Sequence, residues 1–198
     1  MQRGKKAQDT FLAHILAGVE AAKQDPSALL VFSGGETRAE VGARTEGGTN
    51  RTTTEVFALD SYQNLLFSLL RFHELTDSYP QKITLVSYAF KRERFVELHR
   101  HAIRFPRTRF EFVGIDPTWD KEEENVRNGE LENAVKLWRE DLYACNVEGG
   151  LRSKRRGRNA GRRKWTYGLS VETSVKELLR WCEKGGGEVF AGRLPWSE

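Results

Sequence analysis

The chain has 198 residues, of which 38% are hydrophobic and 30% are charged, and its net charge at pH 7 is +4. Eleven Phe, five Trp and five Tyr can supply a hydrophobic core, which excludes an intrinsically disordered chain. No run approaches the ~18 apolar residues that a transmembrane helix needs, and the basic start of the chain leads into an amphipathic segment, so we expect neither a membrane span nor a secretory signal.

The first predicted element is an amphipathic helix that Asp9 or Thr10 caps and that Asp25-Pro26 ends. Its apolar positions recur with the spacing of one helical face, which predicts that they pack on the core. They are Phe11, Leu12, Ile15, Leu16, Val19 and Ala22. The continuous apolar run at 28–32 then predicts a strand that is buried on both faces.

A polar stretch over 36–54 has no periodicity, which is unusual for a connection inside a compact domain. Further strands are predicted at 83–87 and 109–115, and helices at about 55–75, 91–104, 129–143 and 170–184. Strands that alternate with helices predict an α/β fold: a three-layer Rossmann-like architecture with a mostly parallel sheet and helices on both faces. We assign residues 1–145 to this domain, and residues 146–198 to a basic segment and a C-terminal helix packed on it.

Ligands of such folds bind beyond the carboxyl ends of the strands, so polar residues at these ends are candidate binding residues. After the first strand, Ser33, Gly34 and Gly35 can bring backbone N–H groups close to an anion. Glu36 and Arg38 can orient polar groups of that ligand. The alternative is a tight turn without a ligand, and the run matches neither the dinucleotide-binding fingerprint nor a Walker A loop.

A second cluster lies where the predicted helix after residue 55 passes Asp60, Ser61 and Asn64, which share one face. Ser61 and Asn64 can hydrogen-bond a ligand at the edge of the sheet. The alternative interpretation, equally favoured, is that Asp60 or Ser61 only caps a helix.

A third cluster follows the strand at 83–87 and comprises Ser87, Lys91 and Arg94. A hydroxyl at a strand end followed by cations can hold a phosphate or a carboxylate. Cations at a helix N-terminus oppose the helix dipole, which favours an anionic partner. His99 and His101 are two residues apart and do not face each other on a helix, so we predict no shared metal site, although either could carry a proton.

Eight Lys and Arg residues lie in the segment 152–164 without one acid, so the rest of the chain has a net charge of −4. Such a segment can bind nucleic acid, anionic lipid or an acidic partner, but its usual explanation is a solvated loop. Few aromatic residues are interleaved with it, and no RNA-binding module is recognisable. Nucleic acid is therefore the less favoured partner.

Cys145 and Cys182 are far apart in the sequence and lack the spacing of a metal site. Because no export signal is visible, we expect reduced thiols in a cytoplasmic protein.

The ordered set of motifs at 33–38 (SGGETR), 60–68 (DSYQNLLFS), 90–95 (FKRERF) and 114–117 (GIDP), with Leu194-Pro195-Trp196, resembles the YdcF/SanA-like family of Rossmann-type domains, and its eukaryotic, fungal branch in particular. The resemblance covers nearly the whole chain. It implies a doubly wound fold and a polar pocket lined by Ser33, Gly34, Gly35, Asn64, Ser87 and Arg94. S-adenosylmethionine or another nucleotide is the ligand class that it suggests, without a settled reaction.

The sequence departs from the family pattern in three places. Family members begin with a strand before the first helix, whereas here Met1 falls almost at that helix, and a missing central strand would leave a sheet edge unpaired. Thr45-Glu46-Gly47-Gly48 stands where a Ser-Glu-Ala element and a helix are expected, which makes Glu46 the candidate carboxylate. A His common near Phe90 or Lys91 in bacterial members is absent.

These observations leave two functions open. The first is the binding of a small anionic or nucleotide-like ligand at the strand ends, with any reaction undetermined, because neither a nucleophile–base pair nor a metal-ligand cluster is recognisable in the sequence. The alternative is a non-catalytic binding module that uses segment 152–164 to contact nucleic acid or an acidic partner.

Overall fold

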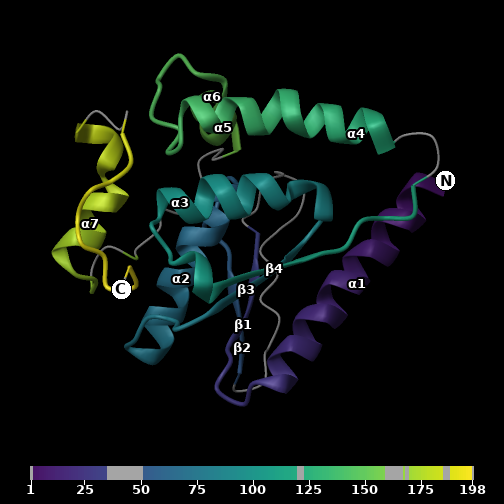
Figure 1. The fold of residues 1–198 in the computed structure, drawn as a ribbon, viewed down its shortest axis with the longest axis horizontal. Helices are drawn as coiled ribbons and strands as arrows, with labels where there is room; N and C mark the ends of the chain where they lie inside the picture. Colours follow the sequence, from purple (N-terminus) through teal and green to yellow (C-terminus); the bar gives the residue numbers. More distant parts are fainter. Residues whose placement is uncertain are drawn as a thin grey trace.

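A computed structural model describes residues 2–34, 51–119, 123–158, 167, 170–184 and 188–197, and within helix residues 2–7 and 183–184 it describes the backbone alone. In these ranges the chain folds into helices around short parallel strands (Figure 1). The strands are β1 (Leu30–Ser33), β2 (Thr52–Glu55), β3 (Ile83–Ser87) and β4 (Phe110–Gly114). No helix in the described part of the chain is long and apolar enough to cross a membrane.

The strands form two parallel pairs. β1 pairs with β2, with Ser33 opposite Glu55, and β3 pairs with β4, with Ser87 opposite Gly114. The predicted α/β class and parallel pairing are therefore confirmed. No ladder of hydrogen bonds joins the two pairs within the described ranges, so these residues do not form one continuous sheet.

Helix α1 (Gln2–Gln24) begins before the predicted caps, so Asp9 and Thr10 lie inside the helix and the predicted start is wrong. α1 contacts both β1 and β3. Phe11, Leu12 and Leu16 were expected in the core, but they are 64%, 54% and 59% exposed. Helical periodicity identifies an apolar face, and it does not show whether another element covers that face.

Helix α2 (Ser61–Thr76) contacts β1 and β2, and in Figure 1 the strands lie between α1 and α2. The helix was predicted to begin near residue 55. Glu55 instead ends β2, and the chain turns over 56–60 before Asp60 caps α2 by accepting a hydrogen bond from the Gln63 N–H at 2.9 Å. The strand β2 was missed because it is short and rich in Thr, so it carries no apolar alternation.

The remaining helical segments cover the ends and one flank of the strands. They are η1 (Ala89–Lys91), η2 (Arg94–His99), α3 (Arg100–Ala102), η3 (Arg107–Arg109), α4 (Glu123–Glu130), η4 (Leu131–Val135), α5 (Lys136–Glu140), α6 (Gly150–Arg158), α7 (Thr173–Leu179) and η5 (Trp181–Lys184). In Figure 1, α4, α5 and α6 lie across the top and α7 lies beside the C-terminus. The first half of the basic segment, expected as a solvated loop, forms α6.

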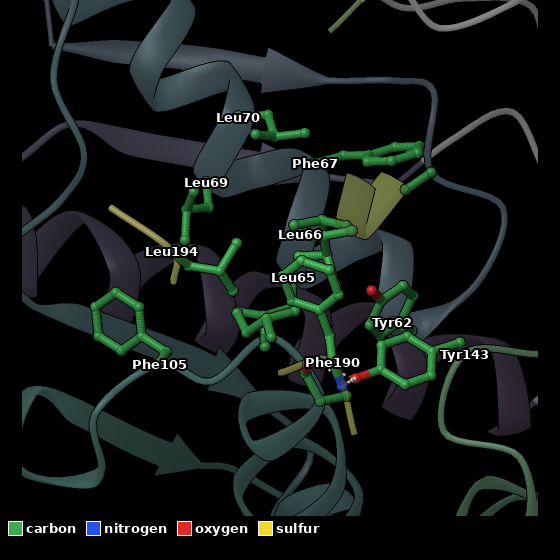
Figure 2. Packing of buried hydrophobic residues seen from close by; sticks show 14 of the residues in the cluster. Tyr62, Leu65, Leu66, Phe67, Leu69, Leu70, Phe105, Tyr143, Phe190 and Leu194 are labelled. Atoms are coloured by element: carbon green, nitrogen blue, oxygen red, sulfur yellow. Dashed lines mark hydrogen bonds between the residues drawn. The ribbon is translucent and has the colours of Figure 1, made fainter. Parts of the chain in front are cut away.

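The hydrophobic core is built on the apolar face of α2 and includes the C-terminal residues (Figure 2). Leu66 and Leu194 are each 1% exposed and belong to the same cluster. The Tyr143 hydroxyl donates to the Ala102 carbonyl oxygen and accepts from the Phe190 N–H, both at 2.9 Å. These bonds satisfy the buried hydroxyl and fix the C-terminal segment against the helices.

Cys145 and Cys182 form a disulfide bond, so the prediction of reduced thiols is wrong. The two residues are 37 positions apart, and folding brings the end of α5 next to η5. Ala144, just before the bond, is fully buried and has a φ of 56°. No short-range sequence signal encodes such a long-range approach.

Candidate functional site

The ends of β1 and β2 bring three of the predicted binding residues together. The Ser33 hydroxyl donates to the Glu55 carboxylate at 3.1 Å and lies 3.3 Å from the Asn64 carbonyl oxygen. The Gly34 N–H donates to the Glu55 carbonyl oxygen at 3.1 Å. A Cβ at Gly34 would meet no described atom within 4 Å, so close packing does not explain this glycine.

Glu55 is the centre of this group, and the sequence interpretation passed over it as a helix residue. Its side chain is fully buried, and it accepts hydrogen bonds from the Phe57 N–H at 2.6 Å, the Ala58 N–H at 3.2 Å and the Tyr167 hydroxyl at 3.2 Å. Burial raises the pKa of the carboxyl group, and the hydrogen bonds oppose this shift. Glu55 thus fixes the turn between β2 and α2, and it also engages the hydroxyl of Ser33.

Ser61, the first residue of α2, lies beside a buried histidine. Its hydroxyl oxygen is 2.8 Å from Nε2 of His99. His99 is fully buried, and its ring lies edge-on to Trp138 at 4.6 Å between centroids. Burial lowers the pKa of His99 well below its usual value, and Arg94 and Arg155 lower it further, so the imidazole is neutral.

The Ser61–His99 pair is a serine–base contact that sequence reasoning missed, because 38 residues separate the partners. Within the described chain, Nδ1 of His99 has no hydrogen-bond partner, so no third group orients the ring as a catalytic triad requires. A proton on His99 would also lie near two arginines. The pair is therefore arranged to satisfy the Ser61 hydroxyl and is poorly arranged to activate it.

Three arginines lie around the N-terminus of α2, and a lysine adjoins one of them, Arg94. We call the four residues the cationic cluster: Lys91, Arg94, Arg155 and Arg158. Arg155 pairs with Asp60 through Nε and Oδ2, and Nη1 of Arg158 donates to the Leu59 carbonyl oxygen at 2.7 Å. The basic helix α6 is therefore folded onto the second predicted cluster. Sequence reasoning treated segment 152–164 and the strand ends as separate sites.

The other two cations come from the third predicted cluster. Nε of Arg94 lies 3.0 Å from Oε1 of Glu130, but neither atom has a partner with hydrogen-bond geometry, so the contact is an ion pair only. Burial lowers the pKa of Lys91, which the neighbouring Arg94 lowers further. Burial likewise lowers the pKa of Arg94 and raises that of Glu130. Both changes reflect charges held away from water.

Among the described residues, the charges of this region do not balance. Four cations face two acids, Asp60 and Glu130, which leaves two positive charges in excess when all six groups are ionised. The Arg94 and Arg155 side chains are only 13% and 18% exposed, and Nη2 of Arg155 is buried without a hydrogen-bond partner among the described residues. A buried guanidinium N–H without an acceptor is unusual, and an anion would satisfy it.

Ser87 ends β3, and its carbonyl oxygen accepts from the Ile115 N–H at 2.9 Å. No hydrogen bond joins Ser87 to Ser33 or Asn64 in the described part of the chain. Its link to the cationic cluster runs through η1, which follows β3 directly and ends at Lys91. The predicted residues Gly35, Glu36, Arg38 and Glu46 lie outside the described residues.

The chain is similar to an uncharacterized protein of Saccharomyces cerevisiae, with 36% identity over 127 residues. The match covers 60% of this chain and 41% of the yeast protein, so the chain spans about two fifths of that relative's length. No family model and no solved structure matches the sequence. The expected fungal relationship is thus supported by a homologue, and membership of the YdcF/SanA-like family is not shown.

Proposed function

We propose that this protein binds a small anionic ligand beside the N-terminus of α2, through the cationic cluster. The observation that carries the proposal is the excess of positive charge, counted over the described residues, at arginines that are largely buried. One of these, Arg155, has an N–H group without a partner among the same residues. Burying cations is unfavourable unless an opposite charge compensates them. An anion would supply that charge, and two charge-assisted hydrogen bonds to a guanidinium make arginine suited to phosphate or carboxylate.

The site also fits a more specific proposal about the fold, namely that it is a three-layer Rossmann-like domain of the YdcF/SanA type. In that fold the ligand lies beyond the carboxyl ends of parallel strands. The ends of β1 and β2 meet the start of α2 through Ser33, Glu55 and Asn64, which supports this placement. We propose binding without a reaction, because the Ser61–His99 pair has no orienting group among the described residues.

The alternative function, contact of segment 152–164 with nucleic acid or an acidic protein, has less support. Arg155 and Arg158 are engaged by Asp60 and Leu59, and Lys154 donates to the Asn133 carbonyl oxygen at 3.2 Å. These contacts direct three of the basic side chains of α6 back onto the protein. A macromolecular partner would require cations that point away from it.

The test is calorimetric titration of the protein with inorganic pyrophosphate at low salt. We expect binding, with the affinity of Arg155→Gln reduced roughly tenfold or more, since charge-assisted hydrogen bonds contribute about 1.5–3 kcal/mol. Lys136→Gln is the matched control, because Lys136 is 51% exposed and pairs with Glu132 one turn away. Its affinity should equal that of the unmodified protein.

Two results would overturn the proposal. One is no heat and no thermal stabilisation with pyrophosphate in protein that melts cooperatively, since a ligand at 100 times its Kd stabilises by about 2.7 kcal/mol. The other is equal loss of affinity in Arg155→Gln and Lys136→Gln, which would indicate a diffuse charge effect. Binding of single-stranded RNA without binding of pyrophosphate would favour the alternative function.

A further inference from the structure

Three aromatic side chains stand beside the cationic cluster at the carboxyl ends of β3 and β4. The rings of Tyr88 and Phe90 are stacked, with centroids 5.2 Å apart and an interplanar angle of 28°. The Trp119 ring is tilted against Phe90 at 5.9 Å. Each of the three side chains is only partly buried. We call them the aromatic row.

The backbone fixes the aromatic row in place. A Cβ at Gly114 would lie 2.7 Å from the Cα of Ala89, so only glycine allows η1 to approach the end of β4 this closely. Across the same junction, the Phe90 N–H donates to Oδ1 of Asp116 at 3.3 Å. His14 of α1 contacts Tyr88 edge-on at 4.7 Å. Tyr88 and Phe90 are therefore held by contacts with α1 and with the end of β4.

Lys91 belongs to both the aromatic row and the cationic cluster. Its Nζ lies 4.7 Å from the ring centroid of Tyr88 and 5.6 Å from that of Phe90, within the range of a cation–π contact. The same ammonium group interacts electrostatically with Arg94 and Glu130. An anion held by the cluster would thus have aromatic surface directly beside it.

Trp119 adds a polar group to this surface. Its Nε1 is buried and has no hydrogen-bond partner among the described residues. Buried indole N–H groups usually find an acceptor, which makes this one an unused donor. A ligand ring that carries acceptor nitrogens or carbonyl oxygens could accept its hydrogen bond, whereas a purely hydrocarbon ring could not.

We propose that the anionic ligand carries a heteroaromatic ring, as a nucleoside phosphate does, and that this ring stacks on the aromatic row while the cationic cluster holds the phosphates. This inference rests on the proposed function, because it assigns the cluster to the anionic part of the same ligand. Stacking on aromatic side chains together with cationic contacts to phosphate is a general means of binding nucleotides. Packing of these rings as ordinary core would leave neither exposed ring surface nor an unpartnered donor.

The experiment compares ADP with pyrophosphate by calorimetric titration at one salt concentration. We expect ADP to bind roughly tenfold or more tightly than pyrophosphate, which is the scale of stacking on one aromatic platform. Phe90→Leu should abolish that advantage and reduce the pyrophosphate affinity far less, because it removes only one of the two rings beside Lys91. Trp119→Phe keeps a ring but removes the donor, so the ADP advantage should shrink several-fold. Trp181→Phe is the matched control, because the Trp181 ring packs on Phe190 and its N–H donates to the Glu188 carbonyl oxygen, so it has no part in the aromatic row.

The outcomes separate the two proposals. If ADP and pyrophosphate bind equally and Phe90→Leu changes neither, the heteroaromatic inference is wrong while the anion site stands. If neither ligand binds the folded protein, the proposed function itself fails. If Phe90→Leu does not fold, the ratio of the ADP and pyrophosphate affinities is compared between the unmodified protein and Trp119→Phe. ADP should also quench tryptophan fluorescence in the unmodified protein, and this quenching should be absent in Trp119→Phe.

Discussion

Two polar regions flank the start of α2, and they use their polar groups differently. At the ends of β1 and β2, the Glu55 carboxylate has four hydrogen-bond donors, and each comes from the protein itself. In the cationic cluster, positive charge exceeds negative charge and Nη2 of Arg155 has no described partner. A satisfied buried network stabilises a fold, whereas an unsatisfied one is costly, which is the basis of the proposed anion site. From the sequence alone, residues of both regions were interpreted as candidate ligand-binding residues.

The largest effect should come from Glu55→Ala. The substitution leaves the Ser33 and Tyr167 hydroxyls and the N–H groups of Phe57 and Ala58 without their acceptor, so we expect the free energy of unfolding to fall by about 3–5 kcal/mol. Urea denaturation measures this change.

Arg155→Gln sharpens the comparison in the same assay. Removing one positive charge from an excess relieves repulsion and offsets part of the loss of the ion pair with Asp60, so we expect a smaller loss of stability than in Glu55→Ala. A loss of stability at Arg155 as large as that at Glu55 would break the distinction between the two regions. So would a loss below about 1 kcal/mol in Glu55→Ala.

The next effect concerns the disulfide bond, which lies nearer to the cationic region. Cys145 is bonded to Cys182, 37 positions away, and its carbonyl oxygen accepts from Nη1 of Arg152 in α6 at 3.0 Å. Removing a cross-link over a loop of this size should lower the free energy of unfolding by about 3–4 kcal/mol, provided that the native geometry is unstrained.

The double variant Cys145→Ser, Cys182→Ser tests this by thermal melting, with reductant added to the unmodified protein as a second route to the same state. Amide hydrogen exchange should quicken over 150–158 and stay unchanged over 52–58, because the cross-link adjoins α6 and not the Glu55 network. Equal quickening in both segments would show that the two regions unfold as one unit.

The smallest effect is a dependence on pH that arises at His99. Burial, together with Arg94 and Arg155, lowers its pKa well below 6.5, so the unfolded chain binds a proton that the folded chain excludes. The free energy of unfolding should therefore decrease as the pH falls from about 6.5 toward the lowered pKa, by at most about 1.4 kcal/mol per pH unit. Glu55 and Glu130 have raised pKa values, so their effect has the opposite sign. Their contribution to the free energy of unfolding decreases as the pH rises from 4.5 toward the raised pKa values.

His99→Gln isolates the histidine contribution, since the amide can still bond the Ser61 hydroxyl and does not titrate. The stability difference between the unmodified protein and this variant should shrink as the pH is lowered through the range below 6.5, and denaturant unfolding at several pH values measures it. A difference independent of pH would mean that His99 has the same pKa in the folded and the unfolded chain, which would contradict the proposed shift.

Elements with a local apolar signal were predictable from the sequence. The strand at 83–87 was expected and forms β3 with these bounds, because Ile, Leu and Val at its positions favour an extended, half-buried chain. The apolar face of α2 was expected and lies in the core, as Leu65 and Leu69 show. In such segments the residues that decide the structure are neighbours in the sequence.

The missed features depend on partners far along the chain. β2 exists because Thr52 to Glu55 pair with β1, and Ser61 and His99 meet only once α2 packs on η2. The fold of α6 onto Asp60 joins positions 95 residues apart. Local sequence propensity does not depend on such contacts. The strand-end site and the basic segment were therefore predicted separately, although they lie together in the fold.

The division of the strands into two pairs has a mechanical consequence. Within the described residues, no backbone hydrogen bond crosses from β1 to β3, so the two pairs are joined through the helices packed around them. The contacts include two hydrogen bonds of 2.8 Å, one between Nε2 of His14 and the Ile115 carbonyl oxygen and one between the Ser61 hydroxyl and Nε2 of His99. Ser33 stands at the end of one pair and Ser87 at the end of the other. Helix α1 contacts both pairs, so its packing helps to set the distance between these two strand ends.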